Sequence, residues 1–490
     1  MAVCSIGFLV LCIAIVIVFH LVPNKRLRQI LVAATSAAFL SMQVPNQRSW
    51  IIFAAVLAGT YLSLVLVRAS RHGAVVGASI GLTVLLFLYL KRYEFFASWV
   101  PIPMDFDLIL HPVELVGLSY MLFKLIHMLV DEWQGQLAPF NLWSYLNYQL
   151  SFFTLTAGPI QRYNDFRLTW EQMDLRPRDP GDALVLWIRL LTGMIKICTL
   201  GAWALTTFKR AAPPDGPHTL TDALVCFYVY PAYLYFNFSG YTDVMLGAGG
   251  LLGFHLPENF NRPYQARNVL DFWDRWHISV THWIRDYVFM TSYKAAATHF
   301  PDAARYWSYA LLFLALFLAG VWHGMTTAFF WFGVLTGLGA AATRAYGDAL
   351  RTVLGGAGVK VYLQNRTIHR VATLVTLHYM AFCFLFFSLS VKQVLTLFAV
   401  VSAGLRPASL GGWDLHSPQV LAIVVAALAL AALWKADAIG AWFGNLASRI
   451  VPRPRVMYSI LFSETALVVL VLYFDWAFQQ EPPPVLYMSF

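Results

Sequence analysis

Two histidines in this chain stand in sequence contexts that suit proton transfer. His323 is the fourth residue of Gly-Val-Trp-His-Gly, inside a long run of apolar residues. An ionisable side chain at membrane depth is costly, and it usually faces a cavity, a partner or a reaction. The flanking Gly320 and Gly324 would let backbone or a substrate approach the imidazole closely. The alternative is a neutral histidine that is hydrogen-bonded between two helices.

The second histidine, His277, follows Trp276 in Trp-Asp-Arg-Trp-His-Ile-Ser. A histidine whose pKa lies near neutrality can take a proton from a hydroxyl and make that oxygen a nucleophile. Desolvation favours a neutral imidazole, so His323 in its apolar run suits the role of general base. His277 could orient or polarise an acyl carbonyl. The sequence has no Gly-x-Ser-x-Gly motif and so gives no support to a serine-hydrolase mechanism.

A polar segment at 237–290 carries most of the chain's other unusual chemistry. Its ionisable residues are Asp243, His255, Glu258, Arg262, Arg267, Asp271, Asp274, Arg275, His277, His282, Arg285 and Asp286. The first part of the segment is rich in glycine and proline. This composition predicts a glycine-rich helix that is followed by an extended, turn-rich loop near 258–264.

Residues 268–290 predict an amphipathic helix in the membrane interface, with Asn268 as its N-cap. Helical spacing places apolar residues on one stripe: Val269, Phe272, Trp273, Trp276, Val280, Trp283 and Tyr287. The other side carries Asp271, Asp274, Arg275, Ile278, His282, Arg285 and Asp286. The alternative is a surface helix whose ion pairs are merely solvated. The tryptophans are interpreted first as interfacial anchors and second as the lining of a substrate pocket.

The elements that must position these residues are membrane helices. Of 490 residues, 59% are hydrophobic and only 12% are charged, about half the charged share of a soluble domain. Apolar blocks occur near 3–22, 29–44, 50–68, 73–90, 113–130, 183–207, 219–236, 306–322, 325–343, 367–390, 417–435 and 456–475. A span needs roughly 20 residues, so about 11 to 13 transmembrane helices are expected. The fold class is therefore all-α and polytopic.

Charge and topology follow from the loops. The net charge of +9 comes mostly from short loops, where it sets orientation, and no nucleic-acid partner is expected. Lys25, Arg26 and Arg28 follow the first apolar block, which predicts an extracytoplasmic N-terminus and argues against a cleaved signal peptide. An apolar run at 138–167 is broken at Gly158-Pro159, which predicts a re-entrant or interfacial segment. The five cysteines show no ligand spacing, so no metal site is expected.

Several motifs together resemble the membrane-bound O-acyltransferase (MBOAT) family. They are FSGYTD at 238–243, PENFNRPY at 257–264, FWDRWHISVTHWIRDYVF at 272–289 and GVWHG at 320–324. Within the family, the chain is similar to the bacterial polysaccharide branch, which includes alginate O-acetyltransferases and the teichoic-acid D-alanyltransferase. Residues 115–135, 155–166 and the terminal VLYMSF resemble the same branch, so the similarity runs from about residue 85 to the C-terminus.

The resemblance implies a fold and a site. Helices would surround a thin centre at which a funnel from each side meets near the catalytic histidine. A single membrane domain over 1–490 would comprise N-terminal helices at 1–112, an MBOAT catalytic core at 113–390 and C-terminal helices at 391–490. His323 matches the presumed catalytic histidine of the family, and His277 matches the second functional histidine.

The residues around these histidines are candidates for substrate binding. They are Trp322, Asn259, Asn261, Arg262, Tyr264, Trp273, Arg275, Trp276, Arg285 and Asp286. The asparagines, Arg262 and Tyr264 would shape the pocket. The charged Arg275, Arg285 and Asp286 would bind a donor phosphate, contact a partner or pair with each other.

Two departures from the family pattern bear on the acyl donor. After Arg-Asp-Tyr, the acetyltransferase members usually continue Pro-Leu-Gly-Gly-Asn, whereas this chain continues VFMTSYKAAATHF. The chain also has Thr336 where the family often has a further histidine. The first departure is similar to the D-alanyltransferase. Both leave open whether the donor is acetyl-CoA or an aminoacyl group on a carrier protein.

The sequence therefore predicts a multi-pass acyltransferase of the bacterial inner membrane, without a bound cofactor. It would move an acyl group, first acetyl and alternatively D-alanyl, from a cytoplasmic donor to hydroxyls of an extracytoplasmic polysaccharide. The resemblance implies an extracytoplasmic protein partner that accepts or relays the acyl group, and membrane lipid surrounds the helices. A rival from another class is a transporter or flippase for a lipid-linked glycan, which would use the polar segment as its path.

Overall fold

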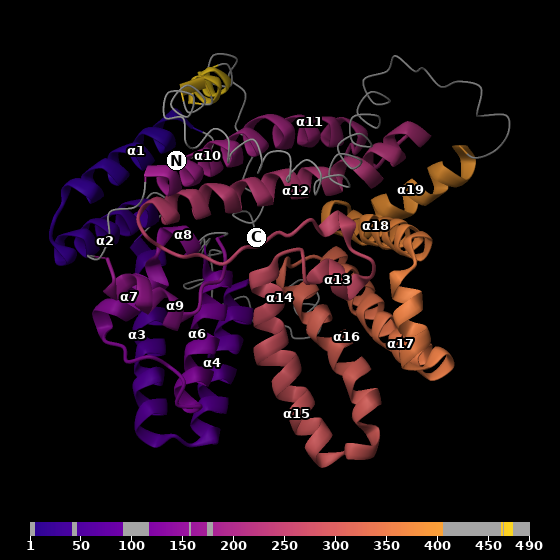
Figure 1. The fold of residues 1–490 in the computed structure, drawn as a ribbon, viewed down its shortest axis with the longest axis horizontal. Coiled ribbons are helices and arrows are strands. Elements are labelled where there is room, and N and C mark those ends of the chain that lie inside the picture. Colours follow the sequence, from indigo (N-terminus) through magenta and orange to yellow (C-terminus); the bar gives the residue numbers. More distant parts are fainter. Residues whose placement is uncertain are drawn as a thin grey trace, which may run out of the picture. The chain divides into compact units, whose positions relative to one another are not determined.

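The computed structural model describes residues 5–41, 47–91, 117–155, 158–173, 180–404, 462–463 and 465–473. Within these ranges the regular elements are helices, and the only extended pairing is a single bridge between Phe260 and Trp276 (Figure 1). The all-α class is confirmed. The apolar block at 417–435, part of the block at 456–475 and the terminal VLYMSF lie outside the described residues.

Chain contacts divide the protein into two compact units. Unit 1 comprises Met1–Cys198, Asn237–Glu258 and Arg455–Phe490, and unit 2 comprises Thr199–Phe236 and Asn259–Pro454. Helix α12 (Leu220–Leu251) contributes its first half to unit 2 and its second half to unit 1. Both candidate histidines belong to unit 2. The partition into 1–112, 113–390 and 391–490 stays a prediction.

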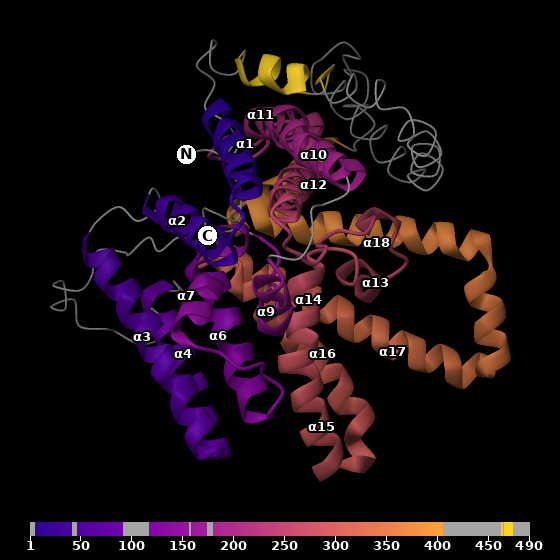
Figure 2. The same cartoon turned by 60° about the vertical axis from the view of Figure 1, so that its left-hand side comes forward.

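Unit 1 is built from helices of the N-terminal half. Helix α3 (Gln47–Ser70) packs beside α4 (Gly73–Lys91), and both contact α6 (Leu118–Trp133) (Figures 1 and 2). The unit also contains α1 (Ile6–Leu21), α2 (Lys25–Ser41) and α10 (Pro180–Ile195).

The break predicted within 138–167 is present in unit 1. The segment forms the short helices α7 (Leu142–Leu150), α8 (Phe152–Leu155) and α9 (Tyr163–Glu171). A Cβ at Gly158 would overlap the carbonyl of Phe153, so the chain can turn back only at a glycine. The fully buried Lys124 holds this segment, because its Nζ donates to Thr154 Oγ1 over 2.6 Å and to the Tyr148 carbonyl over 3.1 Å.

Unit 2 contains the helices that carry the candidate site. They are α11 (Ala202–Ala211), α13 (Val269–Trp273), α14 (Ile278–Ile284), α15 (Met290–His299), α16 (Ala304–Trp322), α17 (Thr327–Gln364), α18 (Arg366–Ser388) and α19 (Val391–Gly404). Helix α17 runs far beyond the predicted block at 325–343. Its continuation over 344–364 contains alanine, leucine and arginine, which favour helix, but also four glycines, and it bends at Gly355, whose φ is 65°.

Four described helical segments are long and apolar enough to cross a membrane: Trp50–Ser70, Gly181–Ala211, Pro301–Trp322 and Arg366–Ser388. Each corresponds to a predicted apolar block. The block at 219–236 is part of the longer α12, which continues through the glycines predicted to be helical. The chain is therefore a multi-pass membrane protein.

Candidate active site

His323 is positioned by the close contact between α16 and α17. It caps the C-terminal end of α16, and its backbone N–H donates to the Gly320 carbonyl over 3.2 Å. A Cβ at Gly320 would overlap Gly333 on α17, so glycine is required where the two backbones meet. The space predicted beside the histidine is thus filled at Gly320 by the neighbouring helix.

His277 is positioned in a different way, by a turn between two short helices. The continuous helix predicted over 268–290 is wrong, because α13 ends at Trp273 and α14 begins at Ile278. Between them His277 has φ 49° and ψ 48°, the left-handed conformation. A non-glycine residue in that conformation costs about 1–2 kcal/mol. Such strain is characteristic of functional sites, where the surrounding structure enforces it.

The loop at 259–261 explains why the helix is broken. The backbone carbonyl of Asn259 accepts from Ile278 N over 3.1 Å, and its side-chain oxygen accepts from Ser279 N over 3.1 Å. Asn261 N donates to the Arg275 carbonyl over 2.9 Å. These bonds take backbone groups that a continuous helix would use internally.

The predicted cap and the predicted apolar stripe of 268–290 are nevertheless found. Asn268 accepts from Asp271 N over 2.8 Å at the start of α13. Val269, Phe272, Trp273, Trp276, Val280 and Trp283 are all buried, whereas Tyr287, the last residue of the predicted stripe, is only half-buried. Asp274, Arg285 and Asp286 on the other side are exposed. The apolar residues of α13 and α14 are therefore buried on both sides of the break, because the turn at His277 keeps both apolar faces directed inward.

The two histidines meet in the interior of unit 2. Their ring centroids lie 6.0 Å apart with 40° between the planes, and His277 and His323 are only 1% and 4% exposed. Trp322 lies beside both rings, at 6.2 Å from His277 and 4.8 Å from His323. Burial, and then the neighbouring His323, lower the pKa of His277 well below its ordinary value, so its imidazole is neutral.

Two buried N–H donors belong to residues that support the histidine pair: Asn259, which is bonded to the residues after His277, and Trp273. Asn259 is fully buried, and its amide nitrogen has no hydrogen-bond partner within the described part of the chain. The indole nitrogen of Trp273 is likewise buried and unpartnered there. Trp273 contacts Phe332 at 6.3 Å between ring centroids, and Phe332 lies 6.0 Å from His323. A buried donor without a partner costs about 1–3 kcal/mol, and a functional role is one explanation for its presence.

The other predicted site residues lie farther out. Tyr264 is buried, and its hydroxyl donates to the Pro231 carbonyl over 2.6 Å. Trp276 packs among Phe260, Phe272 and Phe384. Both therefore support the turn rather than border the histidine rings directly.

The charged candidates lie on the exposed side of the segment. Arg275 Nε pairs with Asp271 Oδ1 at 2.6 Å, and Arg285 Nε pairs with Asp286 Oδ1 at 2.9 Å. Asn261 and Arg262 are exposed as well, and the φ of Arg262 is 50°. The structure therefore brings together His323, His277 and Trp322, with Asn259 bonded to the turn at His277 and Trp273 in contact with Phe332. Arg275 and Arg285 instead pair with neighbouring carboxylates.

Three aromatic residues of the site were not predicted. Phe387 lies 5.1 Å from the His323 ring, and Phe332 and Phe384 stack on each other beside it. They come from α17 and α18, whose aromatic runs have no pattern that distinguishes a site from a core. Thr336, which stands where the family often has histidine, is fully buried and donates to the Phe332 carbonyl over 2.8 Å. Among the described residues, no group of three histidine, cysteine, aspartate or glutamate side chains could hold a metal ion.

Comparison with known proteins gives one family match. Residues 79–366 match the model of the membrane-bound O-acyltransferase family, which is more than half of the chain. The histidine pair and its supporting loop lie within the matched residues.

Curated relatives come from two groups. The chain is 31% identical over 291 residues to the probable alginate O-acetylase of Pseudomonas aeruginosa, covering 57% of this chain and 53% of that protein. It is 30% identical over 289 residues to the teichoic acid D-alanyltransferase of Bacillus subtilis, covering 56% of this chain and 69% of that protein. The Streptococcus thermophilus D-alanyltransferase is 27% identical over 281 residues, covering 56% and 68%. The chain thus spans about half the length of the alginate O-acetylase it matches.

Proposed function

Because the chain belongs to the membrane-bound O-acyltransferase family, we propose that it acylates hydroxyl groups of an extracytoplasmic cell-envelope or exported polysaccharide. The donor would be a cytoplasmic acyl thioester, and the protein would lie in the bacterial inner membrane with its N-terminus outside. The observation that supports this activity best is the buried histidine pair, whose rings lie 6.0 Å apart beside Trp322. Two neutral imidazoles in an apolar surrounding suit proton transfer from a hydroxyl.

In the proposed reaction, His323 takes the proton of the acceptor hydroxyl as its oxygen attacks the acyl carbonyl carbon. The tetrahedral intermediate then collapses, the carbon–sulfur bond breaks, and the departing thiolate receives the proton from His323. His277 orients the acyl group from the other side of the pair. The strained turn at His277 fixes the ring in place, which favours a reactive geometry at the expense of backbone energy.

The developing oxyanion needs hydrogen-bond donors. The amide nitrogen of Asn259 and the indole nitrogen of Trp273 are buried N–H groups without partners among the described residues. Asn259 is bonded to the residue two positions after His277, and Trp273 contacts Phe332 beside His323. Fixed donors in a water-poor site stabilise a tetrahedral intermediate strongly, and the loss of one typically costs about 10²–10³ in rate. We assign both nitrogens to this role.

The acyl group is proposed to be acetyl, carried by acetyl-CoA. The relative from Pseudomonas aeruginosa is named as an alginate O-acetylase and supports this choice. A D-alanyl group on a carrier protein is the second candidate, because the Bacillus subtilis relative at 30% identity is named for D-alanyl transfer to teichoic acid. In either case an extracytoplasmic partner protein would accept or relay the acyl group.

Acyl transfer in isolated membranes tests the proposal. Membranes with wild type, His323→Ala or His378→Gln receive labelled acetyl-CoA, a polysaccharide extract and the partner proteins of the same cells. His378 is the matched control, because it is an exposed histidine on α18 that contacts Tyr228 and not the pair. Label in the polymer with wild type and with His378→Gln, and its loss with His323→Ala, would support O-acetyl transfer.

The other outcomes decide between donors and activities. Label that appears only when a charged aminoacyl carrier replaces acetyl-CoA would assign the enzyme to the second candidate. Equal labelling by wild type and His323→Ala would remove the general-base role. Movement of a lipid-linked glycan in proteoliposomes without any acyl donor would replace the acyltransferase proposal by transport.

A further inference from the structure

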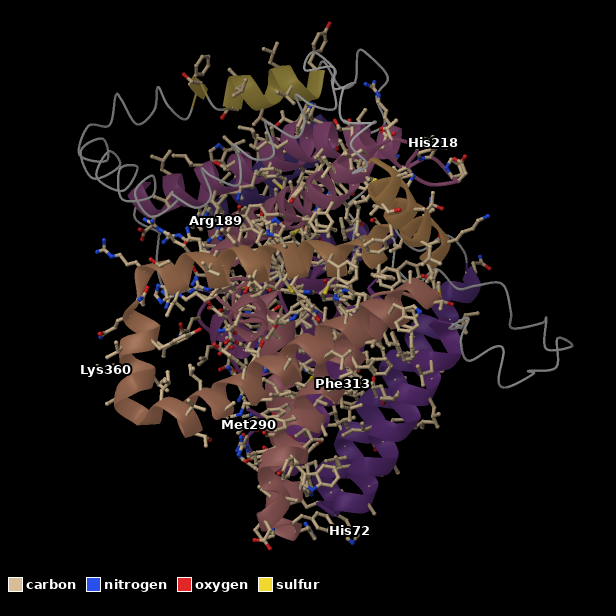
Figure 3. The ribbon with its side chains drawn as sticks, turned by 90° about the vertical axis from the view of Figure 1, so that its right-hand side faces the viewer. His72, Arg189, His218, Met290, Phe313 and Lys360 are labelled. Atoms are coloured by element: carbon tan, nitrogen blue, oxygen red, sulfur yellow. The ribbon has the colours of Figure 1, made fainter. Side chains whose placement is uncertain are left out.

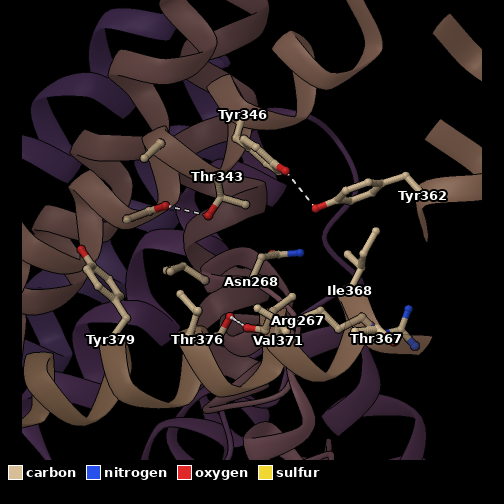
Figure 4. Close-up of a pocket in the computed structure, with 15 residues that line it drawn as sticks. Arg267, Asn268, Thr343, Tyr346, Tyr362, Thr367, Ile368, Val371, Thr376 and Tyr379 are labelled. Atoms are coloured by element: carbon tan, nitrogen blue, oxygen red, sulfur yellow. Dashed lines mark hydrogen bonds between the residues drawn. The ribbon is translucent and has the colours of Figure 1, made fainter. Parts of the chain in front are cut away.

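A cavity of about 540 Å³ lies between α17, α18 and the segment just before α13. Its size is within the range of small-molecule sites in proteins. Figure 4 shows Tyr346 and Tyr362 meeting at one end, where their hydroxyls lie 2.8 Å apart, and Tyr379 at the other end. It is separate from the histidine pair, whose residues do not line it.

The two sides of this cavity have different chemistry. The floor on α18 and α17 is apolar, with Val371, Ala372, Val375 and Ala342. The charged and amide groups come from Arg267 and Asn268 on the opposite side, and the amide nitrogen of Asn268 points into the space (Figure 4). The other polar groups of the lining are threonine and tyrosine hydroxyls on α17 and α18. The ligand that fits this lining is an amphiphile with an apolar chain and a hydrogen-bond-accepting head.

The charge of the head follows from the basic residues around the cavity, of which Arg344 is paired with Asp348 at 3.7 Å. Within the described part of the chain, the guanidinium of Arg267 has no ion-pair partner, and it cannot lose its proton. The bend from 344 to 370 carries five basic residues and one acidic residue: Arg344, Arg351, Lys360, Arg366, Arg370 and Asp348. Figure 3 shows Lys360 at this bend. An anionic head is therefore favoured.

A neighbouring cavity of about 320 Å³ limits where that head can lie. It shares Asn268 and Thr343 with the first cavity and is also lined by three carboxylates, Asp271, Asp274 and Asp348, and by two arginines, Arg344 and Arg351. The carboxylates outnumber the arginines, so this second space suits an anion less well than the first. The head group is therefore expected beside Arg267, near the N-terminal end of α18 at Arg366.

The membrane supplies the apolar part of the ligand. Arg366–Ser388 is a candidate membrane span, so the floor of the cavity is the first part of a spanning helix and its Arg366 end lies at the membrane boundary. The bend that leads into α18 exposes Val353, Val361 and Leu363, at 80%, 69% and 52%. Exposed apolar residues interleaved with basic ones are characteristic of a surface that enters an anionic interface.

We propose that this cavity binds one anionic phospholipid. Its phosphate contacts the Arg267 guanidinium and the Asn268 amide, and one acyl chain lies along α18 from Thr367 to Tyr379, a helical length of roughly 18 Å. The binding is independent of the acyl-transfer reaction. It would fix the bend of α17 against α18 in the membrane.

Native mass spectrometry of the full-length protein, purified in mild detergent and exchanged with defined lipids, tests this site. Wild type should retain one phosphatidylglycerol in preference to phosphatidylcholine. Arg267→Gln should weaken retention about fivefold, the effect of one basic side chain at an anionic surface. Ala372→Phe, which fills the floor but keeps the charge, should also lose the lipid. Arg210→Gln should not, because Arg210 is an exposed arginine at the end of another candidate span and does not line the cavity.

Three results would overturn the proposal. One is equal retention of both lipids, and another is equal lipid retention by wild type and Arg267→Gln. Displacement of the lipid by stoichiometric acetyl-CoA, but not by free phosphate, would assign the cavity to a thioester donor instead. Thermal unfolding in detergent verifies that Ala372→Phe is folded. If this variant does not fold, Arg267→Gln still tests the site, because Arg267 is exposed. No readout involves acyl transfer, so failure here leaves the proposed activity untouched.

Discussion

The two buried histidines of unit 2 are held by contrasting means. His323 ends a regular helix, and its place is set by glycines that bring α16 and α17 into backbone contact. His277 lies in a left-handed turn whose shape depends on hydrogen bonds from the loop at 259–261. His323 is thus positioned by helix packing. His277 is positioned by the hydrogen bonds from residues 259–261, here called the polar clamp, which hold its backbone in a strained conformation.

Because of this difference, the positions of the two histidines are sensitive to different kinds of substitution. Helix packing spreads its energy over many contacts but tolerates no added atom at the closest approach, since interiors are densely packed. A hydrogen-bonded turn tolerates changes of volume nearby, but it concentrates its dependence in a few donors and acceptors. Substitutions can therefore separate the chemistry, the clamp and the packing.

The largest effect is expected from the imidazoles themselves. His323→Ala should lower acyl transfer by about 10²–10⁴, the usual contribution of a general base. His277→Asn should also lower it, and asparagine is chosen because it tolerates the left-handed conformation better than most residues. If the rings act as a unit, the double variant should be hardly worse than His323→Ala alone. Multiplying losses in the double variant, measured as initial rates, would show that the histidines act independently.

The next largest effect is expected at the clamp. Asn259→Ala should lower acyl transfer by about 10²–10³ if its amide nitrogen stabilises the oxyanion. It should also reduce thermal stability, because Ser279 N loses its side-chain acceptor. Asn259→Asp separates these roles, since it keeps an acceptor for Ser279 N and removes the donor. Because burial favours a protonated carboxyl, which is itself a donor, activity is measured at a pH at which the introduced carboxyl is ionised, and full activity there would show that Asn259 only supports the turn.

A substitution at the contact between Gly320 and Gly333 should first lower the thermal stability of the protein. Gly320→Ala places a methyl group against Gly333, and overpacking of this kind costs about 1–3 kcal/mol. Gly347→Ala is the control on α17, where an added Cβ meets nothing within 4 Å and helix propensity rises. Thermal unfolding in detergent measures both. Equal melting temperatures for the two variants would contradict the close contact as the feature that positions His323.

Sequence patterns predicted the helical class, the apolar blocks and the buried face of 268–290, because these depend on periodicity along the chain. They also selected His277 and His323 from their local contexts. The patterns did not predict the break at His277, since it depends on bonds from Asn259, many residues earlier. Helical periodicity within 268–290 cannot show that a distant residue such as Asn259 accepts hydrogen bonds from the backbone N–H groups of that segment.

The aromatic surround of His323 could not be predicted for a related reason. Phe332, Phe384 and Phe387 are separated from His323 in sequence and come from runs in which apolar residues are the rule. Their relevance arises only from the packing of α16, α17 and α18. For the charged residues the sequence left three roles open, and the structure shows the pairing between Arg285 and Asp286 and that between Arg275 and Asp271, while a role in donor or partner binding stays a prediction.

The smallest effect is expected at that exposed side. Arg275→Gln removes the pair with Asp271, and both side chains are about a quarter exposed. Surface ion pairs contribute only about 0–1 kcal/mol, so stability should change little. Asp271 is also held by the backbone N–H of Arg267, which remains in the variant. Transfer rates within twofold of wild type are therefore expected, with unchanged dependence on donor concentration. If Arg275→Gln raised the KM for the donor without changing stability, Arg275 would instead take part in donor binding. The functional part of this segment would then include its exposed face as well as the polar clamp.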